Sequence, residues 1–269
     1  MKKTIGLFLF VAGVICHAGP LNHTQSDACL GAGNCSVALT GTLTGSGTDY
    51  NTYFQTVQSF FGKLEAAAHS DFSVTNTWAL SVAGASFTED FIVHSASHPD
   101  GTTGMFAMGY SIDGTNSASG IAHSFVQVGI KEVDINNPST VIASVSHDYS
   151  GASINQSVMT PAIFPIIYGQ KFEMLVFMQA TAGSIIDIGV GYQLKDVTGS
   201  GVGTSTFDHT LVINSLQTGD NASDLTIESG SGTTYSQAGI VPEPSTLALG
   251  GLALLGFGIA VRRSSRILN

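Results

Sequence analysis

The chain has 269 residues, a formal net charge of −10 at pH 7, and only 10% charged residues. Between residues 19 and 240 there are four lysines, no arginine and 18 acidic residues, a net charge of −14. This composition excludes nucleic acid as a partner and disfavours polyanions, because no basic cluster can neutralise phosphates. These 222 residues suit one domain of sandwich or barrel size.

The first 18 residues have the order of a secretory signal peptide. Two lysines follow the initiator Met, residues 5–15 are apolar, and residues 16 and 18 are small, at the two positions that a signal peptidase reads. We expect signal peptidase to cleave after Ala18, so that the chain is exported through the inner membrane. A lipoprotein signal at Cys16 is the weaker alternative, because Ile15 stands where a small residue is required.

Two cysteines remain in the segment that follows, Cys29 and Cys35. In an oxidising compartment this spacing predicts a disulfide that closes a short loop. A zinc site would need more ligands than His23, which is the one histidine nearby. The segment 19–49 is otherwise rich in turn-forming residues, and we expect it to form an irregular N-terminal arm.

The segment 50–68 is the one stretch with helical spacing. Its large apolar residues recur at steps of three and four: Tyr53, Phe54, Val57, Phe60, Phe61 and Leu64. This spacing predicts a short N-terminal helix whose aromatic row packs in the core. Gly62 interrupts the segment, so two short strands are the alternative.

After residue 69, apolar and polar residues alternate, which is typical of half-buried strands. The predicted strands cover residues 72–82, 86–94, 105–112, 124–133, 141–148, 172–181, 185–194, 207–213 and 225–228. Segments rich in Gly, Pro, Asn and Asp separate them. About nine strands without intervening helices predict an all-β fold, an antiparallel β-sandwich with jelly-roll-like connections over residues 50–229.

The last 29 residues combine three features. The first is an extended, rigid motif, since proline fixes its own φ and restricts the residue before it; it comprises Val241, Pro242, Glu243, Pro244 and Ser245. The second is an apolar segment, 247–261, which as a helix would be about 22 Å long and only marginally spans a hydrocarbon core of roughly 30 Å. The third is a basic stop that keeps the C-terminus cytoplasmic, formed by Arg262, Arg263 and Arg266.

This order of features resembles the PEP-CTERM sorting tail of Gram-negative bacteria, a tail that is also catalogued as the ice-binding protein C-terminal type. The resemblance implies cleavage near Pro-Glu-Pro by a membrane cysteine protease of the exosortase type. It further implies delivery of the mature protein to the cell surface or the extracellular matrix. Residues 230–240 are expected to form a flexible polar spacer before the motif. A plain single-pass membrane anchor is the alternative.

Two carboxylates offer the one candidate catalytic pair. Glu132 and Asp134 lie two residues apart on a predicted strand, and hence on one face at about 7 Å. Two carboxylates on one face are glycosidase-like, whereas exposed solubilising charge is the alternative. Glu89 and Asp90 are adjacent and must point to opposite faces of their strand.

We predict no metal and no cofactor. His94 and His98 are interpreted as solvated loop histidines, because no third ligand can be placed beside them. Asp220, Asn221 and Asp224 fit a turn held by side-chain hydrogen bonds better than a calcium loop, which needs a denser pattern of aspartates.

No catalytic motif is present: the chain lacks a Gly-x-Ser-x-Gly elbow, a cysteine nucleophile pair and a phosphate-binding glycine loop. Tyrosines are available for a sugar-stacking surface, whereas Trp78 is in phase with the predicted core. The threonines at 40, 42 and 44 form too short a line for ice binding. We therefore predict a noncatalytic envelope or matrix protein associated with exopolysaccharide or biofilm. The alternative is a secreted polysaccharide-acting hydrolase.

Overall fold

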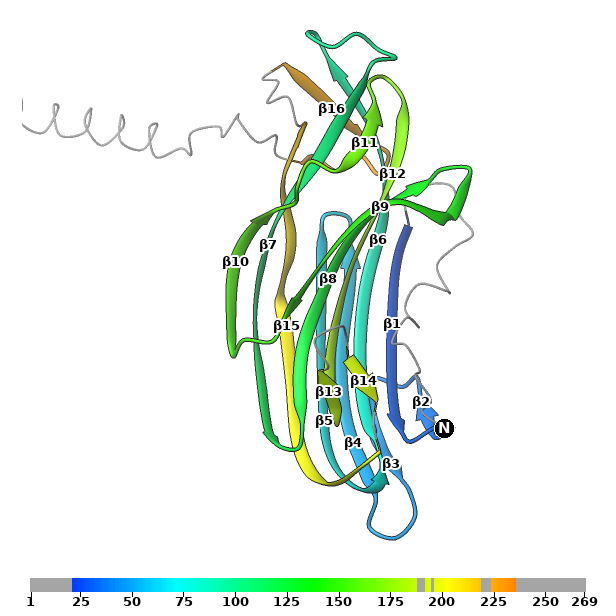
Figure 1. The fold of residues 1–269 in the computed structure, drawn as a ribbon, viewed down its shortest axis with the longest axis vertical. Coiled ribbons are helices and arrows are strands. Elements are labelled where there is room, and N and C mark those ends of the chain that lie inside the picture. The colour runs from blue at the N-terminus through cyan, green and yellow to red at the C-terminus, as the bar shows by residue number, and fades with distance from the viewer. Residues whose placement is uncertain (1–20, 188–191, 195, 219–223, 236–269) are drawn as a thin grey trace, which may run out of the picture.

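The computed structural model describes residues 21–235 except 188–191, 195 and 219–223. Two antiparallel sheets pack face to face (Figure 1). The strands of sheet A are β1 (Leu21–Leu30), β2 (Cys35–Ser36), β6 (Ala79–Ser95), β8 (His123–Asp134), β9 (Asn137–Tyr149), β12 (Lys171–Gly183) and β16 (Leu225–Ser229). The strands of sheet B are β3 (Thr40–Thr44), β4 (Tyr50–Phe60), β5 (Lys63–Thr77), β7 (Thr103–Gly120), β10 (Ser153–Met159), β11 (Phe164–Ile167) and β15 (Val197–Thr218).

The strand order is β2-β1-β6-β12-β8-β9 in sheet A and β10-β7-β15-β5-β4-β3 in sheet B. β16 pairs with the part of β6 that extends beyond β1. In the same way, β11 pairs with the part of β7 that extends beyond β10. The chain crosses between the sheets at every step from β5 to β8, as in a jelly roll. A small hairpin, β13 (Ile185–Asp187) with β14 (Tyr192–Leu194), forms a separate two-stranded sheet. The predicted antiparallel sandwich is confirmed.

The predicted helix over 50–68 is wrong, and the alternative of two strands is correct. β4 and β5 form a hairpin in which Phe60 lies opposite Lys63. Gly62 makes the turn with a φ of +77°, a backbone conformation that favours glycine. The helical spacing arose because large apolar residues lie on both faces of β4, Tyr53 inside and Phe54 outside.

The predicted strand 72–82 is two strands in two different sheets. β5 ends at Thr77 in sheet B, and β6 begins at Ala79 in sheet A. Asn76 adopts a φ of +55° where the chain leaves sheet B. Trp78 therefore does not enter the central core; it packs on the outer face of sheet A, in a cluster that includes Leu80.

The predicted irregular arm contains strands. β1 pairs with β6 over its whole length, from Leu21 opposite Thr88 to Leu30 opposite Ala79, and β3 forms the edge of sheet B. The sequence of β1 is mostly polar, which is why its pattern did not predict a strand. The predicted disulfide is confirmed: Cys29 in β1 is bonded to Cys35 in β2.

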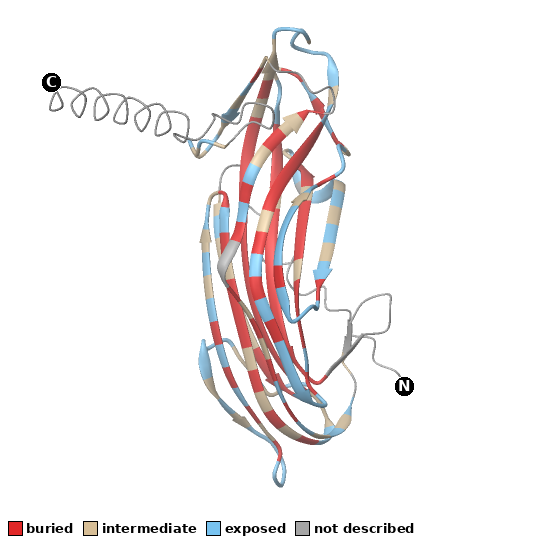
Figure 2. Ribbon diagram, turned by 90° about the vertical axis from the view of Figure 1, so that its left-hand side faces the viewer, coloured by how far each residue is buried: buried red, intermediate tan, exposed pale blue. Residues whose placement is uncertain are grey.

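The core lies between the two sheets, and buried and exposed positions alternate along many of the strands (Figure 2). Its largest buried side chains include Tyr110, Tyr168, Phe72, Phe87, Phe91, Phe106 and Phe164. Within the described residues there is no helix, so none there is long and apolar enough to cross a membrane. The predicted C-terminal helix and span, 247–261, lie outside the described residues.

Candidate functional site

The outer face of sheet B carries a broad array of hydroxyl side chains, which we call the hydroxyl face. Residues directly opposite each other on paired strands share one face of a sheet. Thr42 therefore lies on the same face as Thr52 next to it, and Thr206 on the same face as Thr115. The hydroxyl face consists of Thr40, Thr42, Thr44, Thr52, Thr56, Ser73, Ser111, Thr115, Ser117, Ser119, Ser153, Ser157, Ser200, Thr204 and Thr206.

Three aromatic rings stand on this face, all from β4. Phe54 and Phe60 are 51% and 53% exposed, and Tyr50 is half-buried. The Tyr50 hydroxyl donates a hydrogen bond to Asp71 (3.4 Å), and the negative charge of Asp71 raises the pKa of Tyr50. The ring of Tyr50 therefore stays neutral and oriented at neutral pH.

A hollow of about 360 Å³ opens on the hydroxyl face beside Phe54. Its wall includes His69, whose Nδ1 is hydrogen-bonded to Thr204 Oγ1 (2.8 Å). Glu65 also lines the hollow and forms an ion pair with Lys63 (2.7 Å), while Asp71 follows His69 on the same face of β5. The hollow thus combines an exposed ring with hydrogen-bonding groups and little net charge.

Sequence reasoning missed this surface for one reason: it assigned Phe54 and Phe60 to the core. Most of the tyrosines proposed for sugar stacking are instead buried: Tyr53, Tyr110, Tyr149 and Tyr168. The signal was present in the period-two series from Tyr50 to Phe60, whose even-numbered residues all face outward. The line formed by the threonines at 40, 42 and 44 is now one edge of a much larger array.

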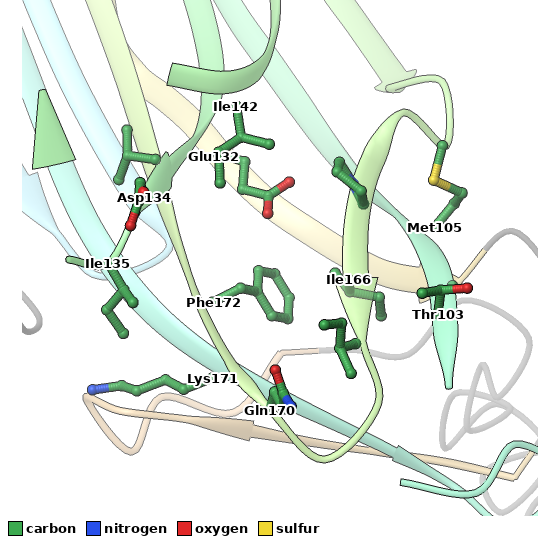
Figure 3. A pocket seen from close by; sticks show the side chains of 14 residues that line it. Thr103, Met105, Glu132, Asp134, Ile135, Ile142, Ile166, Gln170, Lys171 and Phe172 are labelled. Atoms are coloured by element: carbon green, nitrogen blue, oxygen red, sulfur yellow. The ribbon is translucent and has the colours of Figure 1, made fainter. Parts of the chain in front are cut away.

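Glu132 and Asp134 line one pocket of about 730 Å³ at the end of β8 (Figure 3). Glu132 is only 3% exposed, and its Oε2 has no hydrogen-bond partner among the described residues. Burial raises the pKa of Glu132 to about 7. Asp134 is half-buried, and its Oδ1 accepts a hydrogen bond from the backbone N–H of Asn136 (2.8 Å).

The two carboxylates line one pocket but differ in environment. The pairing of β8 with β9 shifts register on both sides of Val133, so strict alternation of faces does not hold there. Asp134 stabilises the β8–β9 turn. Glu132 faces Met174 across the sheet and is buried without a counter-charge.

The other predicted polar residues that the structure describes lie near the end of β6, where Ser95 Oγ is 3.3 Å from both His98 Nδ1 and Asp224 Oδ1. His94 pairs with Asp100 (3.1 Å), and the ring of His98 stacks on Tyr168 at 5.1 Å. Asp224 accepts a hydrogen bond from the backbone N–H of Ser97 (2.6 Å). Within the described ranges no three His, Cys, Asp or Glu side chains gather as a metal site. The residues at 220 and 221 lie outside those ranges.

Glu89 and Asp90 point to opposite faces of β6, as predicted, and both are buried. Asp90 pairs with Lys171 on the outer side. Glu89 points inward and accepts hydrogen bonds from the Ser231 N–H (2.8 Å), the Ser231 Oγ (2.6 Å) and the Tyr235 hydroxyl (3.1 Å).

The predicted spacer over 230–240 is therefore not flexible as far as Tyr235, because Ser231 and Tyr235 are bonded to Glu89. The ring of Tyr235 packs edge-on against Phe91 at a centroid distance of 5.4 Å. Burial, followed by the charge of Glu89, raises the pKa of Tyr235, so its hydroxyl remains a donor at neutral pH. The sandwich therefore holds the chain as far as Tyr235, six residues before Val241.

The described residues define an antiparallel β-sandwich with a weakly charged outer face. Residues 241–264 match the family model described as the PEP-CTERM protein-sorting motif, so the chain carries the predicted sorting tail. This motif indicates export to the cell surface or extracellular space of a Gram-negative bacterium and implies processing by exosortase, a membrane protease. The motif residues and the arginines that follow them lie outside the described residues.

No curated protein matches the chain in sequence. Among solved structures, the enzymatically active domain of tailspike protein 4 from bacteriophage CBA120 is similar with a TM-score of 0.22 and 10% identity, over 58% of this chain and 19% of that one. TmCBM61 in complex with β-1,4-galactotriose has a TM-score of 0.22 and 7% identity, with 65% and 88% covered. The family 11 carbohydrate-binding module from Clostridium thermocellum, in complex with a β-1,3-1,4-mixed-linked tetrasaccharide, has a TM-score of 0.19 and 12% identity, with 70% and 95% covered. TM-scores this low do not assign a function to the sandwich.

Proposed function

We propose that the protein is a noncatalytic component of the cell surface or extracellular matrix that binds a neutral exopolysaccharide on its hydroxyl face. The observation that carries this proposal is the position of Phe54 and Phe60, two exposed rings on a sheet face that is covered with serine and threonine side chains. The sorting tail supports it, because the tail directs the sandwich to the compartment that contains such polymers.

The chemistry of the hydroxyl face suits sugars. The C–H faces of sugar rings are apolar and pack on aromatic rings, while hydroxyl side chains both donate and accept hydrogen bonds. The ectodomain is strongly acidic, with a net charge of −14 over residues 19–240. Uronic-acid polymers are therefore repelled, and uncharged glucans, galactans or mannans are the favoured class.

Binding to a panel of neutral and acidic polysaccharides, measured by affinity electrophoresis, tests this proposal. We expect retardation by at least one neutral polymer and a loss of about tenfold or more in affinity in Phe54→Ala/Phe60→Ala, because each ring loses its buried contact area. Ile142→Ala is the matched control, since Ile142 is equally exposed but lies away from the hydroxyl face. Equal retardation of the double variant and the parent would refute the proposal.

A secreted polysaccharide hydrolase is the second candidate, favoured by one observation: Glu132 has a pKa near neutrality in the pocket that Asp134 also lines. The test is release of reducing ends from the polymers that bind. Activity that disappears in both Glu132→Gln and Asp134→Asn would establish the hydrolase. Retention of the polymer without turnover supports the binding role.

We further propose that signal peptidase cleaves after Ala18 and that exosortase cleaves near Pro242–Ser245. Cleavage there leaves every contact of Tyr235 intact, so the mature sandwich keeps its fold. The intact mass of the protein recovered from cells and medium tests both sites. A mature form that still contains residues 247–266 would instead indicate a plain membrane anchor.

A further inference from the structure

The pocket at the end of β8 is a second candidate binding site, separate from the hydroxyl face. It lies between β8 and the start of β9 in sheet A, and β11 and the start of β7 in sheet B, with β12 beside it. Three large apolar side chains of its lining are exposed to solvent: Met105, Ile142 and Ile167. An apolar ligand would cover surface that is now in contact with water.

The pocket contains one deeply buried charged group. Figure 3 shows the Glu132 carboxyl pointing into the pocket near the ring of Phe172. Its Oε2 is buried without a hydrogen-bond partner among the described residues. A buried carboxylate is costly unless a cation or a hydrogen-bond donor accompanies it. A positively charged ligand would therefore stabilise the ionised Glu132 side chain.

The protein itself supplies no counter-charge for Glu132 from the pocket lining. The other charged residues there are Asp134 and Lys171. Asp134 accepts the hydrogen bond of the turn, and Lys171 pairs with the buried Asp90. Glu132 is thus the group available to a ligand.

We propose that this pocket binds a small organic amine with an aliphatic body. The ammonium group pairs with the carboxylate of Glu132, and the aliphatic chain lies against Ile142, Ile166 and Phe172 in the pocket wall. This ligand class satisfies both features of the site, the single uncompensated carboxylate and the apolar lining. The inference does not depend on the hydroxyl face or on the polysaccharide.

Other ligand classes fit less well. An organic anion would meet the charges of Glu132 and Asp134 and the acidic surface of the chain. A bare metal ion would lack ligands, because no group of three suitable side chains occurs among the described residues. A sugar would leave its hydroxyls against aliphatic side chains.

Isothermal titration of the purified protein with butylamine, hexylamine and octylamine tests the proposal, with 1-hexanol and hexanoate as matched probes. We expect hexylamine to bind and affinity to rise about three- to fourfold for each added CH₂ group. Hexanol and hexanoate should bind at least about tenfold more weakly, since neither supplies a cation to the carboxylate. Equal binding of hexanol and hexylamine, or no amine binding at millimolar concentration, would overturn the proposal.

Two variants locate the site. Glu132→Gln keeps the shape of the side chain but removes its charge, and should lower hexylamine affinity about tenfold or more. Asp148→Asn is the control, because it removes a carboxylate on the neighbouring strand β9 that is not part of the pocket lining, and it should change affinity less than about twofold. Ile142→Ala, an exposed position, should weaken octylamine more than butylamine. Affinities unchanged in both Glu132→Gln and Ile142→Ala would place amine binding elsewhere and reject the proposal.

Discussion

The two faces of β4 reverse the usual distribution of side chains. On the inner face Asn51 and Gln55 are buried, whereas on the outer face Phe54 and Phe60 are exposed to solvent. Polar groups are normally buried only when their hydrogen bonds are satisfied, and large exposed rings often mark binding surfaces. The strand therefore uses amides to join the sheets and leaves its rings free for a ligand.

The buried amides of β4 are bonded to sheet A. Asn51 donates to the carbonyl groups of Cys29 (2.9 Å) and Leu80 (3.1 Å), and Gln55 donates to the carbonyl of Asp27 (2.7 Å). Each amide thus links sheet B to backbone carbonyl groups of sheet A through hydrogen bonds that an apolar side chain could not make. The comparison predicts that losing a buried polar group destabilises the fold far more than losing an exposed ring.

The largest effect is expected for Asn51→Ala. The substitution removes two hydrogen bonds to carbonyl groups of sheet A and removes the acceptor of the Ser70 hydroxyl (2.7 Å). We expect a loss of about 3–4 kcal/mol in the free energy of unfolding, measured by urea denaturation. Thr52→Ala, its exposed neighbour, should cost less than about 0.5 kcal/mol. Similar losses in the two variants would show that the buried amide contributes no more than its neighbour.

Glu132 is a second buried polar group, and its effect on the free energy of unfolding depends on pH. The pKa of Glu132 is about 7 in the folded state, above its ordinary value of 4.5. Between pH 4.5 and pH 7 the carboxyl group is therefore protonated in the folded state and ionised in the unfolded state. The contribution of Glu132 to stability is therefore greatest below pH 4.5 and is lost as the pH rises to 7, by about 3 kcal/mol.

The measurement is the free energy of unfolding at pH 4.5 and pH 7 for the parent and for Glu132→Gln. The difference between the two proteins isolates Glu132 from the other carboxyl groups, of which Asp224 has a lowered pKa and an opposite slope. We expect the variant to gain stability relative to the parent as the pH rises. A pH-independent difference would contradict the raised pKa.

Tyr235→Phe tests the contact that closes the sandwich before the sorting tail. The variant keeps the ring on Phe91 but removes one donor to the buried Glu89, which still accepts two hydrogen bonds from Ser231. We expect a loss of about 1–2 kcal/mol in the free energy of unfolding. Ending the chain after Ile240 should leave the free energy unchanged, because Tyr235 and its contacts are retained. Destabilisation by that truncation would mean that residues beyond 240 also support the fold.

The sequence predicted the elements in which local pattern and long-range packing agree. Strands such as 124–133 alternate because one face meets the core, and the sorting tail is defined by local chemistry alone. The polar strand β1 was missed because its place is set by pairing with β6, fifty residues and more away. The crossing at Trp78 was missed because no glycine or proline marks it.

The candidate sites divide in the same way. The spacing of Glu132 and Asp134 singled out these two carboxylates, but it did not predict the pocket. The apolar wall of that pocket comes from β7, β9, β11 and β12, which only the folded chain brings together. The hydroxyl face required the register of six strands. Local alternation predicts which side of a strand is polar, but not which strands lie side by side.

The smallest effect on stability is expected for the exposed rings themselves. Phe54→Ala and Phe60→Ala should each change the free energy of unfolding by less than about 0.5 kcal/mol, since about half of each ring is already in contact with water. The buried Tyr53, which precedes Phe54 in the chain, is the control, and Tyr53→Ala should cost about 3–5 kcal/mol. If the two exposed rings also proved essential for stability, their exposure would serve the fold, and the hydroxyl face would lose its main argument as a binding surface.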